Sequence, residues 1–97
     1  MTFGTQFRPR VGGNLVVTPA VGSANSAINS QDTAIRLANS GANICYVRVG
    51  EAAQTATTAD LALLPNSVTI IQKADGHANI AYISAAGTTL NIHTGSI

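Results

Sequence analysis

The sequence predicts an all-β fold, a small antiparallel β-sandwich or barrel of the jelly-roll or immunoglobulin-like kind with an extended N-terminal arm. Three observations predict it. Short runs rich in Val, Ile and Thr follow one another along the 97 residues, and Gly, Pro, Asn and Asp separate them. No credible long helix interrupts them. A chain of this length has room for one hydrophobic core, so we expect an arm over 1–13 and a single β domain over 14–97.

Residues 1–13 contain most of the candidate binding residues. Phe3, Phe7 and Val11 are spaced four apart, as on one face of a helix. Glycines and a proline among them disfavour a helix, namely Gly4, Pro9, Gly12 and Gly13. We therefore expect a tail that is either flexible or bound to a partner. Its aromatic side chains suit docking on a neighbouring subunit, so we interpret Phe3, Phe7, Arg8 and Arg10 as partner-binding residues.

Six short strands are predicted in the rest of the chain. Each is rich in β-branched or other apolar residues, and turn residues bound most of the runs. They cover 15–18, 33–38, 44–49, 68–72, 79–83 and 89–93. Residues 21–31 are small and polar and form either a loop or a seventh, short edge strand.

The strands 33–38 and 44–49 are expected to form an antiparallel hairpin, because residues 39–43 have the composition of a turn. Arg36 and Arg48 both point away from the aliphatic faces of these strands, so the hairpin would bring the two side chains near each other. Either they guard solvated strand edges, or they meet acidic groups on a partner surface. Both are kept as candidate partner-binding residues.

The strands 79–83 and 89–93 are expected to form a second hairpin, since residues 85–87 suit a three-residue loop with a left-handed glycine. In that register His77 lies diagonally from His93, at about 7–8 Å. A metal site needs three or four ligands, and no third ligand is suitably spaced. The sequence therefore predicts no metal site.

The remaining segments are predicted as connections. Residues 51–60 are almost wholly Ala, Thr and Gln and should form a surface loop. The leucines in 61–64 are expected to tuck back as a plug before a turn at 65–67. Asp75 and Gly76 favour a tight turn, because glycine accepts positive φ.

Charged residues are scarce. Five Lys or Arg and four Asp or Glu give a net charge of +1, and the chain lacks the clustered cations that nucleic-acid binding needs. No apolar run approaches the roughly 20 residues of a membrane span. A surface of Ala, Thr, Asn and Ser resists association poorly. We therefore expect a homo-oligomer, a trimer or a dimer, with no nucleic-acid or membrane partner.

No constellation of catalytic residues is recognisable. A Gly-x-Ser-x-Gly elbow is absent, and the four carboxylates lie in separate loops, namely Asp32, Glu51, Asp60 and Asp75. Cys45 is the only cysteine, and its alternation with Val47 and Val49 is typical of a buried, inert thiol. The sequence predicts no enzyme and no cofactor. The N-terminus lacks the basic and apolar segments of a signal peptide. With Cys45 alone no internal disulfide can form, which fits synthesis in the cytosol.

Three segments resemble a pattern of small structural proteins of tailed bacteriophages. They are IRLANSGAN with VRVG (35–50), ATTAD with LLPNSV (56–68), and ISAAGTTLNIHTG (83–95). In that pattern a strand ending in Val-x-Val-Gly leads to an Ala/Thr-rich loop, then to a Leu-Pro-Gly-Ser or Leu-Pro-Asn-Ser turn. A strand with Thr-Leu-x-Ile-x-x-Gly closes it. The resemblance spans 33–95 and leaves the arm outside.

The resemblance implies a virion component made in the host bacterial cytoplasm. A capsid decoration (cement) protein on the capsid surface or neck is expected, which would bridge capsid subunits and bind the major capsid protein or another virion protein. The alternative is a tail, neck or fibre-associated module that recognises a virion partner or a host receptor or glycan. A cellular adaptor or a toxin–antitoxin-like protein is the third class.

Overall fold

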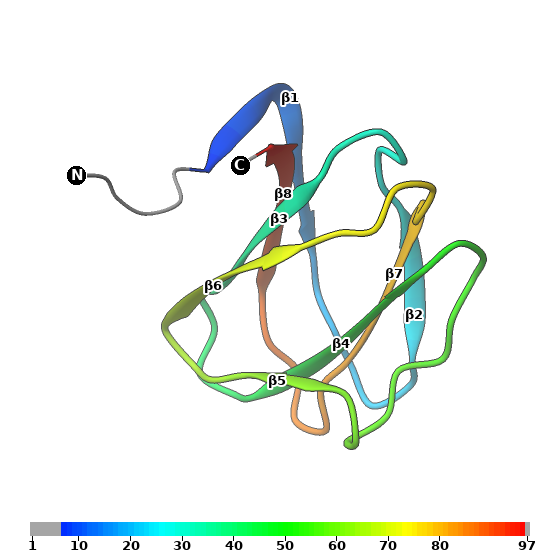
Figure 1. The fold of residues 1–97 in the computed structure, drawn as a ribbon. Helices are drawn as coiled ribbons and strands as arrows, with labels where there is room; N and C mark the ends of the chain where they lie inside the picture. The colour runs from blue at the N-terminus through cyan, green and yellow to red at the C-terminus, as the bar shows by residue number, and fades with distance from the viewer. Residues whose placement is uncertain (1–6, 97) are drawn as a thin grey trace.

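The computed structural model describes residues 7–96, and in that range the fold is all-β. Eight strands form two antiparallel four-stranded sheets (Figure 1). Sheet A has the order β1-β8-β3-β6 and sheet B the order β2-β7-β4-β5. The strands are β1 (Arg8–Val17), β2 (Ala24–Ala27), β3 (Ala34–Asn39), β4 (Cys45–Gly50), β5 (Leu61–Leu63), β6 (Ser67–Gln72), β7 (Asn79–Ile83) and β8 (Leu90–Ser96). The described residues include no helix that could span a membrane.

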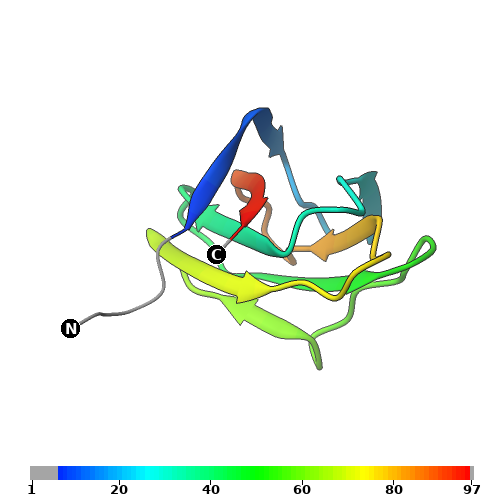
Figure 2. The ribbon, with the colours of Figure 1, turned by 45° about the horizontal axis from the view of Figure 1, so that its top comes forward.

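The pairing joins the first half of the chain to the second. β1 pairs with β8, β2 with β7, β3 with β6 and β4 with β5. The chain therefore forms one long antiparallel ribbon that turns back at residues 51–60. Two further pairings, β3 with β8 and β4 with β7, close this ribbon into the two sheets. In Figure 2, β1 (blue) and β5 (yellow-green) lie on opposite margins of the fold.

The core lies between the two sheets and consists of alternate side chains of their strands. The buried cluster contains Ile35, Leu37, Leu90 and Ile92 from sheet A and Cys45, Val47, Leu63, Ile80 and Tyr82 from sheet B. Side chains at period 2 point to one face of a strand, so β3, β4, β7 and β8 contribute two residues each to the cluster, and the short β5 contributes one. Burial of each large aliphatic side chain contributes about 1.5–3 kcal/mol. The arrangement is sandwich-like.

The predicted strand positions agree with the structure. The runs 33–38, 44–49, 68–72, 79–83 and 89–93 coincide with β3, β4, β6, β7 and β8 to within three residues at each end, and 79–83 matches β7 at both ends. Residues 21–31 contain the edge strand β2, and most of 51–60 is loop. The turns are also where expected, with Asn66 at φ 55° and Gly76 at φ 89°. Of the leucine plug, Leu63 is buried, whereas Leu64 is exposed.

Both predicted hairpins are wrong. β3 belongs to sheet A and β4 to sheet B, and β7 and β8 are divided in the same way. Residues 40–44 and 84–89 therefore carry the chain from one sheet to the other. A hairpin would have set the apolar faces of its two strands side by side on one sheet. Because the chain crosses between the sheets, the apolar face of one strand packs against that of the other, and this removes more apolar area from water.

β1 begins at Arg8, within the segment that the sequence assigns to the arm. It pairs with β8 in two stretches, Arg8–Pro9 against Gly95–Ser96 and Asn14–Val17 against Leu90–His93. Between them residues 10–13 bulge outward opposite Thr94, and Val11 at the bulge is fully exposed. Gly12 has a φ of 75° there, a conformation that glycine adopts without strain. Residues 1–6, including Phe3, lie outside the described residues.

Candidate interaction surface

The outward side chains of sheet A form two rows that cross all four strands. We call them together the sheet A outer face. One row is Val16, Asn91, Ala38 and Val68, and the other is Asn14, His93, Arg36 and Ile70. Aliphatic side chains at its two margins remain about half exposed, at 55% for Val16, 54% for Val68 and 46% for Ile70. Polar side chains occupy its centre.

The opposite outer face, on sheet B, is covered by the loop 51–60. Gln54 and Asn25 exchange hydrogen bonds, with the Gln54 N–H donating to Asn25 Oδ1 at 2.8 Å. Asn79 Nδ2 donates to the Glu51 carbonyl oxygen at 3.0 Å. Ala81, which points outward between two core residues of β7, is fully buried as a result. The two outer faces therefore differ, and only that of sheet A presents half-exposed aliphatic side chains.

Phe7 lies at the end of the sheet A outer face. Its ring meets the His93 imidazole edge-on, with 6.1 Å between centroids and 81° between planes. His93 Nε2 bonds the carbonyl oxygen of Arg10 at 2.9 Å, so this nitrogen acts as the donor. A side chain at Gly95 would collide with the backbone of Arg8 and would lie 3.0 Å from Phe7 Cζ. Glycine at this position lets residues 7–10 lie close against β8.

Arg10 is held in an ion pair with Asp32. Its Nε donates to Asp32 Oδ2 at 2.8 Å and its Nη2 to Oδ1 at 2.6 Å. The hydrogen bonds from Arg10 lower the pKa of the buried Asp32 carboxyl, against the raising effect of its burial. The pair ties the bulge of β1 to the connection between β2 and β3.

The other candidate arginines are placed separately. Arg48 Nε donates to Asp60 Oδ1 at 2.9 Å on the sheet B side. The N–H of Thr57 and the Arg48 guanidinium hold the pKa of Asp60 below its usual value. Arg36 lies on the sheet A outer face, so the predicted proximity of Arg36 and Arg48 is wrong. Within residues 7–96, Arg36 forms no ion pair, and Arg8 is exposed.

The histidines do not meet. His77 precedes β7 in sheet B and His93 lies in β8 of sheet A, so their predicted diagonal pairing is wrong. The described part of the chain contains no group of three His, Cys, Asp or Glu side chains that could hold a metal ion. Cys45 is fully buried, and this burial raises the pKa of its thiol to about 11. A thiol with that pKa is protonated and unreactive near neutral pH.

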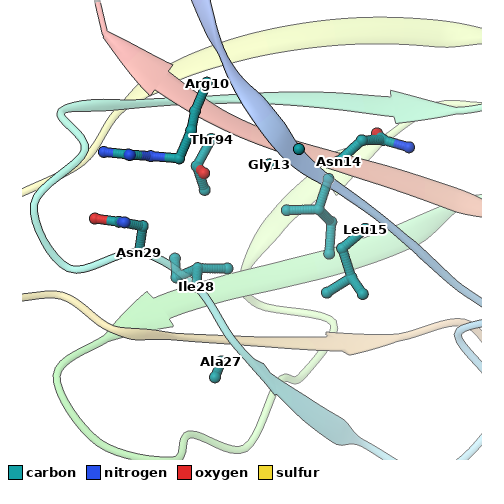
Figure 3. A pocket seen from close by; sticks show the side chains of 10 residues that line it. Arg10, Gly13, Asn14, Leu15, Ala27, Ile28, Asn29 and Thr94 are labelled. Carbon is teal, nitrogen blue, oxygen red and sulfur yellow. The ribbon is translucent and has the colours of Figure 1, made fainter.

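A cavity of about 440 Å³ opens between the edges of the two sheets on the β1 side. Leu15, Ile28 and Ile92 give it an apolar part, and Figure 3 shows Arg10, Asn29 and Thr94 grouped on one side of it. The described residues that line it include no thiol, imidazole or carboxylate. The cavity can accept an apolar side chain, but it offers neither a nucleophile nor a proton-transfer group.

Sequence reasoning missed the aliphatic members of the sheet A outer face. In 68–72, apolar side chains occur on both faces of the strand, since Val68 and Ile70 point outward while Ile71 packs on the core. The apolar residues on both faces of this strand were the signal available in the sequence. The Arg10–Asp32 pair had no such signal, because 22 residues separate its members.

Comparison with protein families and with curated proteins identifies no relative. A scan against protein-family models finds no matching family, and a search of the curated proteins finds no match. Function must therefore be inferred from the fold and from the chemistry of the surface.

Proposed function

We propose that the protein is a non-enzymatic virion structural protein, a capsid decoration protein that stabilises a phage head by bridging capsid subunits. The observation that carries the proposal is the sheet A outer face. It is open and flanked by half-exposed aliphatic side chains, whereas the face of sheet B is covered by the chain's own loop. Val68 and Ile70 lie next to each other at one margin of this face, and neighbouring exposed aliphatic side chains on a small domain are typical of a protein-binding surface.

The strand order supports this class of function. Eight strands in the orders β1-β8-β3-β6 and β2-β7-β4-β5 fit a jelly roll, in which a long ribbon is folded into two sheets. Jelly rolls are a common architecture of viral capsid domains. Because one fold serves many functions, the strand order raises the expectation of a virion role without assigning it.

The chemistry of the sheet A outer face supports a partner surface of matching chemistry. Val16, Val68 and Ile70 would be buried against apolar side chains, and Arg36 would meet a carboxylate of the partner, most simply on the major capsid protein. Arg36 is suited to this role because no carboxylate of residues 7–96 pairs with it. Phe7 lies at the end of the same face, and residues 1–6 with Phe3 are proposed to act as an arm that extends the contact.

Copy number in purified virions tests the role. Quantitative mass spectrometry of particles that carry the encoding gene should find the chain in numbers comparable with the major capsid protein. A few copies per particle would contradict decoration and favour the neck or tail alternative. Absence from the particle would contradict any virion role.

A matched pair of charge variants tests the surface. Asn91→Asp adds a negative charge at the centre of the sheet A outer face, and Thr55→Asp adds the same charge on the exposed loop over sheet B. We expect Asn91→Asp to lose at least tenfold in affinity for particles that lack the protein, while Thr55→Asp binds as the wild type does. Equal binding by the two variants would refute the assignment of this face.

A further inference from the structure

The edge of β6 differs from the other sheet edges in having no protection. Natural proteins protect edge strands with charges, prolines, bulges or shortness. β1 has Pro9 and a bulge that begins at Arg10. β2 and β5 are protected by their shortness, with four and three residues. β6 has six residues in an unbroken register with β3, and its sequence SVTIIQ contains no charge, proline or glycine.

Alternate residues of β6 direct their backbone groups to this free edge. The N–H of Lys73, which follows the strand, donates to the Thr33 carbonyl oxygen at 2.8 Å, on the β3 side. In an antiparallel strand the N–H and C=O groups of successive residues point to opposite sides. The backbone groups of Val68, Ile70 and Gln72 therefore point away from β3, toward the edge where the structure places no strand among residues 7–96.

We propose that β6 pairs antiparallel with β6 of a second copy, about a two-fold axis that passes between their Thr69 residues. Opposed residues in an antiparallel pair share a face of the sheet, so only registers that match Val68 and Ile70 with outward residues are allowed. With Thr69 on the axis, Val68 of each copy lies opposite Ile70 of the other. Moving the axis to Ile70 would oppose Val68 to Gln72, a poorer apolar match.

A second copy fits this edge because the strand is complementary to itself. Two-fold pairing sets the outward aliphatic side chains Val68 and Ile70 against each other and opposes no like charges, since β6 carries none. It also joins two four-stranded sheets into one sheet of eight strands, with a continuous outer face across the axis. The inference does not rest on the proposed function, because it uses the β6 edge alone and concerns the isolated protein.

Cross-linking tests the register. Val68→Cys chains are mixed with Ile70→Cys chains under mild oxidation, with Cys45 left in place because it is buried. We expect a disulfide-linked dimer in the mixture and little in either variant alone. The two residues 68 of a dimer, and likewise the two residues 70, are offset by two positions along the strands, so their Cα atoms lie beyond the limit of roughly 7 Å for a disulfide. Cross-linking of Ile70→Cys alone at the yield of the mixture would overturn the register. No cross-linking would overturn the pairing.

Sedimentation equilibrium tests the oligomer without cross-linking. The wild type should be a dimer, and Ile70→Lys should shift it to monomer. Val16→Lys places the same charge on the opposite margin of the same face, at a similarly exposed residue, and should remain dimeric. Circular dichroism and thermal unfolding of both variants check that each is folded. A monomeric wild type, or equal dissociation by both variants, would overturn the proposal.

Discussion

Replacement of Asn39 by alanine should destabilise the protein more than any other exchange of a polar residue in β3. Asn39 ends this strand and is 1% exposed. Its Nδ2 donates to the carbonyl oxygens of Asn43 at 2.8 Å and Leu63 at 3.0 Å. Its Oδ1 accepts from Thr88 Oγ1 at 2.7 Å and from the Gly41 N–H at 3.2 Å. One side chain thus links sheet A to sheet B and to both crossing segments.

The magnitude follows from these four hydrogen bonds. Each contributes about 0.5–1.5 kcal/mol net, and a buried group left without a partner costs about 1–3 kcal/mol. Some of the freed groups will be reached by water, so we expect the free energy of unfolding to fall by about 3 kcal/mol. A domain of this size has a total of roughly 5–15 kcal/mol. The midpoint of thermal unfolding should fall by about 12 °C or more.

Urea denaturation followed by circular dichroism measures the change. The control is Asn91→Ala, which removes one partly exposed amide whose contact with Ser40 Oγ is 3.4 Å long, and which should cost less than about 1 kcal/mol. Asn39→Asp retains the acceptors but loses both donors, and should be destabilised nearly as much as Asn39→Ala. If Asn39→Ala unfolds within 1 kcal/mol of the control, on the scale set by a single hydrogen bond, the reasoning is refuted.

Three other predictions concern buried groups. Lys73→Met should lower the free energy of unfolding in urea by about 2 kcal/mol, because Nζ donates to three carbonyl oxygens, of Ser30, Ala74 and His77; an unchanged midpoint would contradict this. Since Arg10 lowers the folded-state pKa of Asp32 below 3.8, the wild type should be more stable than Asp32→Asn at pH 7, and the advantage should disappear as pH falls through the folded-state pKa. If the midpoints of thermal unfolding of the wild type and Asp32→Asn change with pH in parallel, the stabilising role of the Arg10–Asp32 pair is contradicted. Iodoacetamide at pH 8 should modify Cys45 slowly in the native protein and rapidly in urea, as followed by mass spectrometry, because burial raises its pKa to about 11; fast native labelling would exclude a buried thiol.

The positions of most strands could be predicted because their signals are local. In 33–38 the alternation of Ile35, Arg36 and Leu37 defines both the strand and its two faces, and the structure places Arg36 outward as expected. The pairing partners could not be predicted from the same signals. A turn by composition does not reveal whether the next strand returns to the same sheet or crosses to the other.

The crossings are determined by contacts between residues far apart in the sequence. Asn39 reaches Leu63, 24 residues away, and Ser84 Oγ donates to the Ile44 carbonyl oxygen at 2.7 Å, 40 residues away. The candidate surface could be predicted only where its residues give a local signal. The outward direction of Arg36 follows from strand periodicity, whereas the pairing of Arg10 with Asp32 and of Arg48 with Asp60 depends on how the loops are placed.

Several polar side chains of this weakly charged chain are used inside the fold. Asp32, Asn39, Lys73, Ser84 and Thr94 are buried, and no buried side-chain nitrogen or oxygen of residues 7–96 lacks a hydrogen-bond partner. Asn39, Lys73 and Ser84 donate to backbone carbonyl oxygens of the connecting segments, where each would be costly to leave unsatisfied. The two ion pairs of residues 7–96 likewise fix the bulge and the loop over sheet B. The surface that remains is weakly charged, so association at the sheet A outer face and at the β6 edge meets little electrostatic opposition.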